Sequence, residues 1–460
     1  MSTDAFQTAS RREFLKRVGA FSATGVAAPF ALNLAAMGQA AAFNATDYKA
    51  LVCVFLYGGN DYANTLVPYD SASHNLYLGQ RAAIATARSD LAATALSPTV
   101  ALANSRQYAL APQLAPLLPI FNANRLAVML NIGNLVQPTT KTQYTNKSVP
   151  LPPKLFSHND QQSVWQSSSP EGSTSGWGGR MGDLFASGNG NATFSCVSMA
   201  GNAVYLAGKT AVQYQVTTGG SVPISGLAAP LFGSQSCSDA LRSIISAPRT
   251  NLFEAEHTRI TKRSIEADVQ LTTALAAGPV ITTPFSGLNS LAAQLQMVAK
   301  MISVRSALGA KRQVFFVSLG GFDLHDGLPE NHPGLLTTVA DAMASFNAAT
   351  TELGVADKVT TFTASDFGRT LTTDGDGSDH GWGSMHFVMG GAVKGRAFYG
   401  TPPAIANNGP DDVGQGRLLP GLAVDQLGAT LGKWFGVSDT EMAIVMPQIA
   451  NYTTRDLGFF

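Results

Sequence analysis

Aspartates and histidines gather in a few short polar segments of this 460-residue chain, and together they have the chemistry of a metal site. Carboxylate oxygen and imidazole nitrogen are the ligands of Zn²⁺ and Mn²⁺, whereas a larger share of oxygen favours Mg²⁺ or Ca²⁺. The candidate ligands are Asp61 in GGND, Asp323 and His325 in GGFDLHDG, Asp366 in TASDFGRT, His380 in SDHGWG, and His386 six residues later. We therefore predict a divalent metal centre of one or two ions, with zinc as the first expectation and manganese, magnesium or calcium as alternatives.

Ordinary structural roles compete with the metal hypothesis at each of these positions. An Asp after a strand commonly caps a helix, a lone His is often a hydrogen-bonded structural residue, and Asp-Gly pairs such as Asp374-Gly375 are turn residues. The metal hypothesis is favoured because several candidate ligands occur close together in the sequence. Four of the seven histidines lie in polar segments within seven residues of an Asp, namely His158, His325, His380 and His386.

Apolar runs end just before most of these polar segments. The runs KALVCVFLY, LAVMLNI, QVFFVSL and KVTTFTA show no polar alternation, which is typical of strands buried on both faces of a parallel sheet. We predict strands over residues 49–57, 126–132, 313–319, 358–364 and 387–389. In open α/β sheets the ligand site lies beyond the carboxyl ends of the strands, so the candidate ligands are expected to meet there.

Helical patterns alternate with these strands. Apolar residues at helical spacing predict helices over residues 113–122, 290–308, 335–353 and 425–435. Strands alternating with helices indicate an α/β domain with a doubly wound, mostly parallel sheet. The stretch 170–284 differs, because Gly-, Ser- and Thr-rich sequence, short alternating pieces and a charged helix near 251–275 follow one another; we predict an insertion or cap there.

The N-terminus has the pattern of a twin-arginine export signal. Arg11 and Arg12 stand in SRREFLK, an uncharged stretch follows to residue 42, and small residues at its end suit signal peptidase. An ordinary secretory signal or a membrane anchor is the alternative, but Gly, Ser, Thr, Pro and Asn interrupt the apolar core. We predict a signal over residues 1–42, carriage of the folded protein by the twin-arginine translocase, and a mature protein that is periplasmic or secreted.

The remaining chain, 43–460, is nearly neutral. Residues 1–42 carry four basic and two acidic residues, which leaves 26 positive and 28 negative residues in the rest. This balance gives no basic surface for nucleic acid, and no second apolar run is long enough for a stable membrane span. Its length fits two domains or one large α/β domain with an insertion. Cys53 is expected to be a buried thiol, whereas Cys196 and Cys237 have the option of pairing in an oxidising compartment.

The combined motifs resemble one known family. GGND after the first strand, Ser157-His158 opening a helix that ends in Trp165, GGFD-x-H, SDFGRT, DHGWG and HFVMGGAVKG together are similar to the DUF1501 family of exported bacterial proteins. That family is placed by fold in the alkaline phosphatase–sulfatase superfamily. The resemblance implies a three-layer α/β/α sandwich, usually two divalent metals, and a nucleophile at a helix N-terminus.

The resemblance also assigns roles to single residues. Asp61 and Asp366 match the superfamily's metal-binding aspartates, Asp323 and His325 match its Asp–His pair at a shorter spacing, and His380 or His386 matches its last histidine. Ser157 takes the nucleophile position, with a plain helix cap as the alternative. Arg369 is expected either to bind an anionic substrate oxygen or to pair with a nearby Asp.

Two departures from the superfamily pattern leave two functions open. Phe367 stands where a metal-binding His is usual, and no sulfatase-type C-x-P-x-R motif is present. The first reading is a metal-dependent hydrolase of phosphate or sulfate esters, acting on an anionic ester substrate. The second reading is a catalytically degenerate relative that serves as a periplasmic binding or assembly protein.

Overall fold

A ten-stranded sheet forms the centre of the computed structural model, which describes residues 46–460. The twin-arginine signal predicted for residues 1–42 lies outside the described residues. The strand order across the sheet is β11-β4-β10-β9-β1-β8-β5-β6-β7, and β12 pairs with β4. The strands are β1 (Lys49–Leu56), β4 (Leu126–Gly133), β5 (Cys196–Ser198), β6 (Tyr214–Thr217), β7 (Gly220–Ser221), β8 (Arg312–Leu319), β9 (Val359–Ser365), β10 (Ser384–Met389), β11 (Ala397–Tyr399) and β12 (Leu422–Ala423).

Most neighbouring strands in this sheet are parallel. β1 pairs in parallel with β8 on one side and with β9 on the other. β10 runs antiparallel to both of its neighbours, β9 and β4, so the loop that precedes β10 lies at the edge where β1, β4, β8 and β9 end. This geometry brings the polar segments that follow four parallel strands to the same side of the sheet as the segment that precedes β10.

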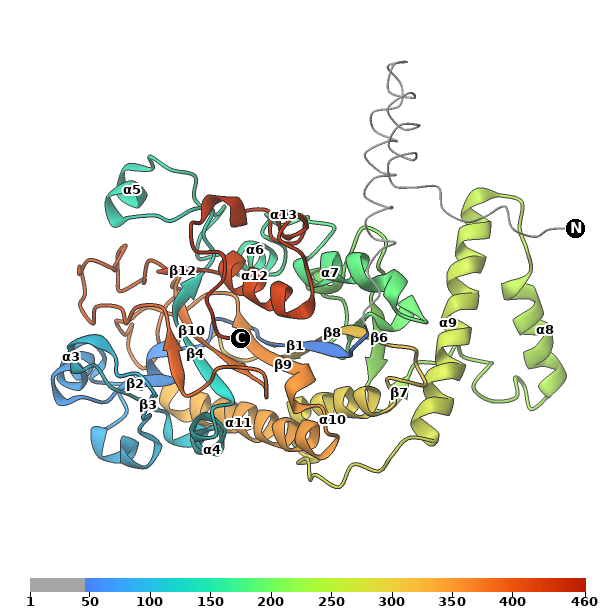
Figure 1. The fold of residues 1–460 in the computed structure, drawn as a ribbon, viewed down its shortest axis with the longest axis horizontal. Coiled ribbons are helices and arrows are strands. Elements are labelled where there is room, and N and C mark those ends of the chain that lie inside the picture. Colours follow the sequence, from blue (N-terminus) through green and yellow to red (C-terminus); the bar gives the residue numbers. More distant parts are fainter. Residues whose placement is uncertain (1–45) are drawn as a thin grey trace, which may run out of the picture. The chain divides into compact units, whose positions relative to one another are not determined.

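Helices cover both faces of the sheet, as Figure 1 shows. On one face lie α10 (Ser290–Ser303) and α11 (Leu328–Glu352), which pack against each other. On the other face lie α6 (His158–Ser167), α7 (Trp177–Phe185), α12 (Val424–Phe435) and the short α13 (Met442–Val445). The predicted α/β fold with a mostly parallel sheet between two helical layers is confirmed.

The residues of β1 explain why the sheet needs cover on both sides. All of β1 after Lys49 is buried, so successive side chains point into opposite cores. Phe55 meets the ring of Trp165 edge-on at 6.1 Å, and Trp165 stacks on Phe362 of β9. Trp177 of α7 also stacks on Phe362, at 5.4 Å, so aromatic packing fixes α6 and α7 on the sheet.

Two predicted helices begin or run differently from the pattern. Residues 112–122 form a 3₁₀ helix, η5 (Pro112–Leu117), followed by the short α4 (Leu118–Asn122), because Pro116 and Pro119 remove backbone donors within the segment. α11 begins seven residues earlier than the predicted start at 335. Its first turn accepts Pro329, since the first backbone N–H groups of a helix need no helical partner, whereas Pro333 lies inside the helix.

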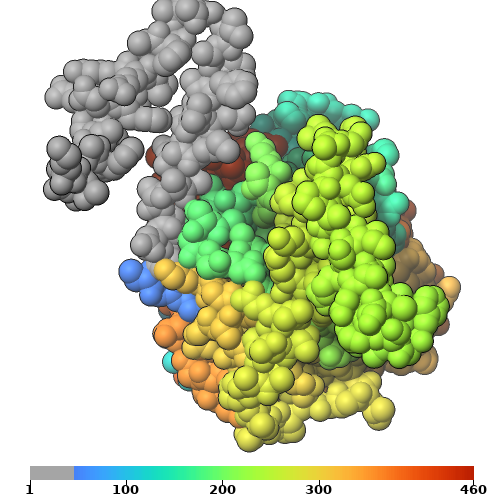
Figure 2. Space-filling view, turned by 90° about the vertical axis from the view of Figure 1, so that its right-hand side faces the viewer, coloured from blue at the N-terminus to red at the C-terminus, as the bar shows by residue number. Residues whose placement is uncertain are grey.

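Part of the segment 170–284 belongs to the central sheet and its helical layer, and another part lies outside them. α7 packs against β8 and β5, and β5 pairs in parallel with β8. α8 (Gln235–Ser246) and α9 (Leu252–Ala276) pack on each other beyond β7. In the space-filling view they form the yellow-green surface turned to the viewer (Figure 2).

Outside the main sheet, the chain after β1 forms a small two-stranded sheet of β2 (Leu66–Pro68) and β3 (Tyr108–Leu110), with α3 (Ser71–Arg81) beside it. A short helix, α5 (Lys141–Asn146), follows β4. Cys53, Cys196 and Cys237 are all free thiols, so Cys196 and Cys237 do not pair. Within residues 46–460 no helix has the length and apolar character needed to cross a bilayer.

Candidate metal centre

The loops after β1 and β8 are pressed together at the carboxyl edge of the sheet. Gly58 has φ of +115°, and a Cβ atom at this position would come within 2.3 Å of the Asp323 backbone nitrogen. Only glycine tolerates both the backbone conformation and the contact. The close approach at Gly58 therefore sets where Asp323 begins its turn toward the other polar loops.

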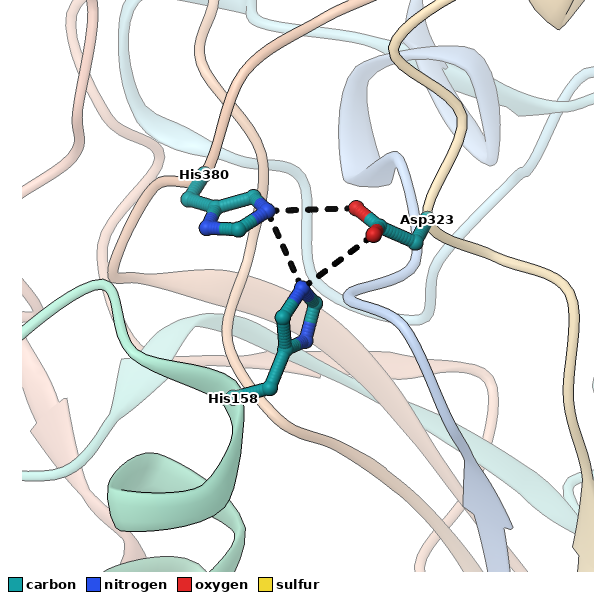
Figure 3. A group of neighbouring side chains, drawn as sticks. All are labelled: His158, Asp323 and His380. Carbon is teal, nitrogen blue, oxygen red and sulfur yellow. Dashed lines mark hydrogen bonds and ion pairs between the residues drawn. The ribbon is translucent and has the colours of Figure 1, made fainter.

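His158 is the first residue of α6, and its ring is oriented by Asp366. The His158 Nδ1–H donates to Asp366 Oδ2 at 2.6 Å, and this hydrogen bond raises the pKa of His158. The same carboxylate oxygen also accepts from Gln162 and from the Gly58 backbone, and the whole Asp366 side chain is buried. The imidazole Nε2 of His158 is thereby turned toward Asp323 and His380 (Figure 3).

His380 reaches the same point from the loop before β10. Its Nδ1–H donates to the carbonyl of Phe156 at 2.8 Å, so its Nε2 carries the lone pair. That Nε2 lies 3.0 Å from the Nε2 of His158 and 2.9 Å from the Nε2 of His325. Burial lowers the pKa of His380, which favours the neutral ring that a metal ion requires.

Asp323 supplies the carboxylate of the cluster. Its Oδ1 lies 3.1 Å from the Nε2 atoms of both His325 and His380, and its Oδ2 lies 3.3 Å from the Nε2 of His158. Burial alone would raise the pKa of Asp323, but the hydrogen bond and charge of Arg369 hold it below its usual value. Asp323 is therefore an anion that faces three imidazole nitrogens.

His158, Asp323 and His380 form a ligand set that suits a metal ion, because one ligand atom of each lies within 4.8 Å of the others. His325 Nε2 adjoins two of these residues, Asp323 and His380. Each of His158 and His380 uses its Nδ1–H on an acceptor of the protein, so in their neutral forms two Nε2 lone pairs face each other at 3.0 Å. This arrangement is unfavourable unless a proton or a cation lies between the rings. Ligand atoms of a tetrahedral Zn²⁺ site with bonds of about 2.0–2.1 Å stand roughly 3.3 Å apart, close to the separations seen here. Imidazole nitrogens beside a single carboxylate favour zinc over magnesium or calcium.

A second group of ligand atoms shares two of these histidines. His325, Asp379 and His380 place one ligand atom each within 4.8 Å of the others. Asp379 is already engaged, because its Oδ2 accepts from Arg417 at 2.7 Å and its Oδ1 accepts from the His380 backbone. His325 Nδ1 lies 3.6 Å from Asp374 Oδ2. We therefore regard the Asp323 set as the stronger candidate.

Arg369 is a buried hydrogen-bond donor to Asp323. Its side chain is fully buried and donates to the carbonyls of Ser378 and Gly58 and, at 2.8 Å, to Asp323 Oδ1. Of the two roles that the sequence left open for Arg369, pairing with an Asp is the one its contacts match. Arg369 thus fixes the orientation of the Asp323 carboxylate.

Asp61 and His386 lie outside both groups of converging ligand atoms. Asp61 is buried in an ion pair with Arg81 and accepts from Ser378 Oγ at 2.7 Å. Burial would raise the pKa of Asp61, but Arg81 holds it low. His386 is buried within β10, where burial lowers its pKa to about 3, and its Nδ1 lies 3.2 Å from Thr363 Oγ1. Both side chains are buried, Asp61 in the loop after β1 and His386 within β10.

Ser157 stands at the N-cap of α6, directly before His158. Its side chain makes no capping bond to the helix backbone, and its Oγ instead donates to Asp160 Oδ2 at 2.8 Å. The residues on either side of Ser157 both contact His380, through the Phe156 carbonyl and the His158 ring. The predicted nucleophile position therefore lies beside the centre in the chain.

The model of one protein family matches residues 48–445, and that family is described as a protein of unknown function, DUF1501. The chain belongs to the DUF1501 family. The resemblance seen in the sequence is thereby confirmed. No curated protein matches the chain.

Solved structures similar to this DUF1501 protein include Ps i-CgsB in complex with k-i-k-neocarrahexaose, at 10% identity and a TM-score of 0.35, covering 88% of this chain and 77% of that one. Another is the PsFucS1 sulfatase from Pseudoalteromonas sp., at 10% identity and a TM-score of 0.33, covering 88% of this chain and 71% of that one. TM-scores of this size say nothing about the residues of the centre.

Phe367 bounds the candidate metal centre of this DUF1501 chain on one side. Its buried ring lies 4.8 Å from the rings of both His158 and His380, measured between centroids, and against Gly59. A phenyl ring supplies no ligand atom. Phe367 therefore adds no ligand for a second ion beside the rings of His158 and His380. The ring instead limits how the two histidines can turn.

His158 was not among the ligands predicted from the sequence. Its neighbours in the chain are polar residues of a helix start, and no strand ends just before it, so the strand-end rule did not select it. One signal was available: His158 is one of the four histidines in polar segments with an Asp close by. What the sequence could not show is that Asp366, 208 positions away, would orient this ring.

Proposed function

We propose that this chain is a metal-dependent hydrolase of phosphate or sulfate esters that works after export, in the periplasm or outside the cell. The observation that carries the proposal is the convergence of the His158 and His380 Nε2 atoms and the Asp323 carboxylate at the carboxyl edge of the sheet. A divalent ion bound there would polarise an ester oxygen and offset the charge of an anionic substrate. Zinc fits this donor set best.

The residues of the chain divide the remaining work. Asp366 fixes the ring of His158, the Phe156 carbonyl fixes the ring of His380, and Arg369 fixes Asp323, so the ligand atoms are preorganised. Ser157 is the proposed nucleophile toward the phosphorus or sulfur atom of the ester. Ser157 directly precedes the candidate ligand His158 in the chain, and its hydroxyl is bonded to Asp160 and to none of the candidate ligands.

The proposal is tested first by metal content. Full-length protein should be isolated from the periplasm without chelator and analysed by mass spectrometry of its metals. We expect close to one zinc per chain, and a large loss of metal in His158→Ala. His257→Ala is the matched control, because His257 is an exposed histidine of α9 outside both ligand groups. Metal-free wild-type protein would contradict the proposal.

Turnover is the second test. Wild-type protein should hydrolyse p-nitrophenyl phosphate or p-nitrophenyl sulfate, and chelator or His158→Ala should abolish this activity. The two substrates distinguish a phosphatase from a sulfatase. Activity that survives complete removal of the metal would contradict the metal-dependent mechanism.

A binding or assembly protein is the second candidate function, and two observations favour it. Phe367 contributes a ring and no ligand atom beside His158 and His380. Arg369, fully buried and engaged with Ser378, Gly58 and Asp323, is held away from any substrate oxygen. Stoichiometric metal without turnover of either ester would favour this second candidate.

A further inference from the structure

Ser157 and Asp160 form a hydrogen-bonded pair at the start of α6. The hydroxyl Oγ of Ser157 donates to Asp160 Oδ2 at 2.8 Å, and Asp160 is only 4% exposed. In most helices a serine at the N-cap spends its side-chain oxygen on the backbone of the first turn, but Ser157 makes no such bond. Its hydroxyl proton is directed at a carboxylate instead.

The backbone before Ser157 is sharply turned toward the centre. Phe156 has φ of +73° and Lys154 has φ of +42°, conformations that are costly for residues with side chains. The turn places the Phe156 carbonyl on His380 Nδ1, while the next residue but one, His158, touches His380 with its ring. Ser157 is thus held between two residues that contact the same ligand.

We propose that Asp160 is the general base that accepts the hydroxyl proton of Ser157 when Ser157 attacks the ester. This inference deepens the proposed function and rests on it for the substrate class. As the bond from Oγ to phosphorus or sulfur forms, the proton passes to Asp160 Oδ2. The bond to the leaving oxygen breaks with its electron pair on that oxygen, which receives the proton from Asp160 through solvent. Water then hydrolyses the Ser157 ester and restores the hydroxyl.

Among residues 46–460, no other group near Ser157 is as well placed to take its proton. His158 uses Nδ1 on Asp366 and turns Nε2 to Asp323 and His380, so neither nitrogen serves Ser157. Lys154 lies 3.5 Å from the other oxygen of Asp160 and is largely exposed, and it leaves Oδ2 to the serine. A nucleophile bonded to a buried carboxylate is the arrangement that base catalysis requires.

The competing explanation is a purely structural pair that stiffens the first turn of α6. The two explanations differ in the reactivity of Ser157, which is measurable without ester turnover. An alkyl fluorophosphonate loses fluoride when a serine oxygen attacks its phosphorus, and mass spectrometry then locates the adduct. A structural pair gives no reason for this reaction to occur at Ser157 or to depend on Asp160.

We expect the fluorophosphonate to label Ser157 of wild-type protein and to leave Ser157→Ala unlabelled. Asp160→Asn keeps a hydrogen-bond acceptor of the same size but cannot take a proton, so its labelling rate should fall by about 100-fold or more. Asp268→Asn is the matched control, because Asp268 also accepts from a serine, Ser221, on a distant surface. Melting temperature and metal content check that each variant is folded.

Labelling of Asp160→Asn at the wild-type rate, or no adduct on Ser157, would overturn the inference. If the adduct on Ser157 depends on Asp160 while p-nitrophenyl esters are not turned over, the inference stands and the proposed hydrolase function fails. If esters are turned over equally by wild type and Asp160→Asn, the hydrolase function stands and the inference fails.

Discussion

His158 and Asp366 show how a buried carboxylate sets the direction of a ligand. Asp366 Oδ2 accepts from His158, Gln162 and the Gly58 backbone, whereas its Oδ1 has no hydrogen-bond partner among the described residues. The carboxylate therefore concentrates its bonding on the oxygen that holds the imidazole. A charged partner of this kind also increases the basicity of the ring nitrogen that faces a metal.

Asp366→Asn removes that charge with little change in size. We expect zinc affinity to fall by about 10- to 100-fold, because the ring of His158 loses both its fixed tautomer and part of its basicity. Competition with a chromogenic chelator measures the change. Asp456→Asn, which breaks only an exposed pair with Lys433, serves as the control. Equal affinity in Asp366→Asn and wild type would contradict the orienting role.

Asp425 makes a pH-dependent contribution to stability that is independent of the metal centre. Burial raises the pKa of Asp425 to about 6 in the folded protein, from 3.8. Because the folded state binds this proton more tightly than the unfolded chain, the stabilisation is complete below about pH 4 and is lost as pH rises through 6.

Asp425→Asn keeps an oxygen for the Gln448 backbone and Ser168 but carries no charge. Relative to wild type, its free energy of unfolding should therefore increase between pH 4 and 7.5, by up to about 3 kcal/mol for a shift of two pKa units. Urea unfolding at several pH values measures this difference. If the difference in unfolding free energy between the variant and wild type did not change with pH, the pKa of Asp425 would not be raised by folding.

At the scale of elements, the backbone of the loop after β1 determines the position of the loop after β8. Gly58→Ala introduces a Cβ that meets the Asp323 backbone at 2.3 Å and enforces a backbone conformation unsuited to alanine. We expect the free energy of unfolding to fall by more than about 2 kcal/mol and metal binding to weaken, because the Asp323 loop must move. Calorimetry and metal titration measure the two effects.

Gly79→Ala is the control for this substitution. Gly79 lies within α3, where an added Cβ meets nothing within 4 Å, so the change should be neutral or stabilising by about 0.5–1 kcal/mol. If Gly58→Ala were equally harmless, the two loops would not depend on each other's position.

The buried strands and the helices that pack on them were largely predictable from the sequence. β1, β4, β8 and β9 are rich in apolar residues and are buried along most of their length, and α10 and α12 show clear helical spacing. The direction of β10 was not predictable, since an apolar strand of six residues looks the same in either orientation. The early start of α11 was hidden by Pro329, which a first turn accepts, and by Pro333, which lies inside the helix, where proline is normally disfavoured.

The candidate site was predictable only in part, for a related reason. Asp323, His325 and His380 follow the rule that ligands gather at strand ends. His158 belongs to a helix start, and the sequence cannot show that Asp61 is matched by the buried charge of Arg81, 20 positions later. The local sequence pattern identifies the polar residues at the carboxyl edge of the sheet. Hydrogen bonds and ion pairs between residues far apart in the chain determine which of these side chains face the candidate metal centre.

At the scale of the whole molecule, export is predicted from residues 1–42. Changing both Arg11 and Arg12 to Lys keeps the charge but removes the paired guanidinium groups of the signal. We expect precursor to accumulate in the cytoplasm, which cell fractionation and immunoblotting detect. Replacing Lys16 alone by Arg is the control, and normal periplasmic accumulation of the double variant would contradict a twin-arginine route.

Metal binding should also stabilise the whole domain, since the candidate ligands His158, Asp323 and His380 come from three distant segments of the chain. An ion present at about 1,000 times its dissociation constant adds roughly 4 kcal/mol to the free energy of unfolding. For a domain of this length, that corresponds to a rise in melting temperature of about 5 °C. Chelator should therefore lower the melting temperature of wild-type protein by that amount, and added zinc should restore it.

His158→Ala provides the decisive comparison for this effect. The variant should melt near the temperature of chelated wild type, and neither chelator nor zinc should shift it much, because one candidate ligand, the ring held by Asp366, is gone. His257→Ala should respond to chelator and zinc as wild type does. A chelator-induced shift of equal size in His158→Ala and wild type would mean that the metal binds elsewhere on the molecule.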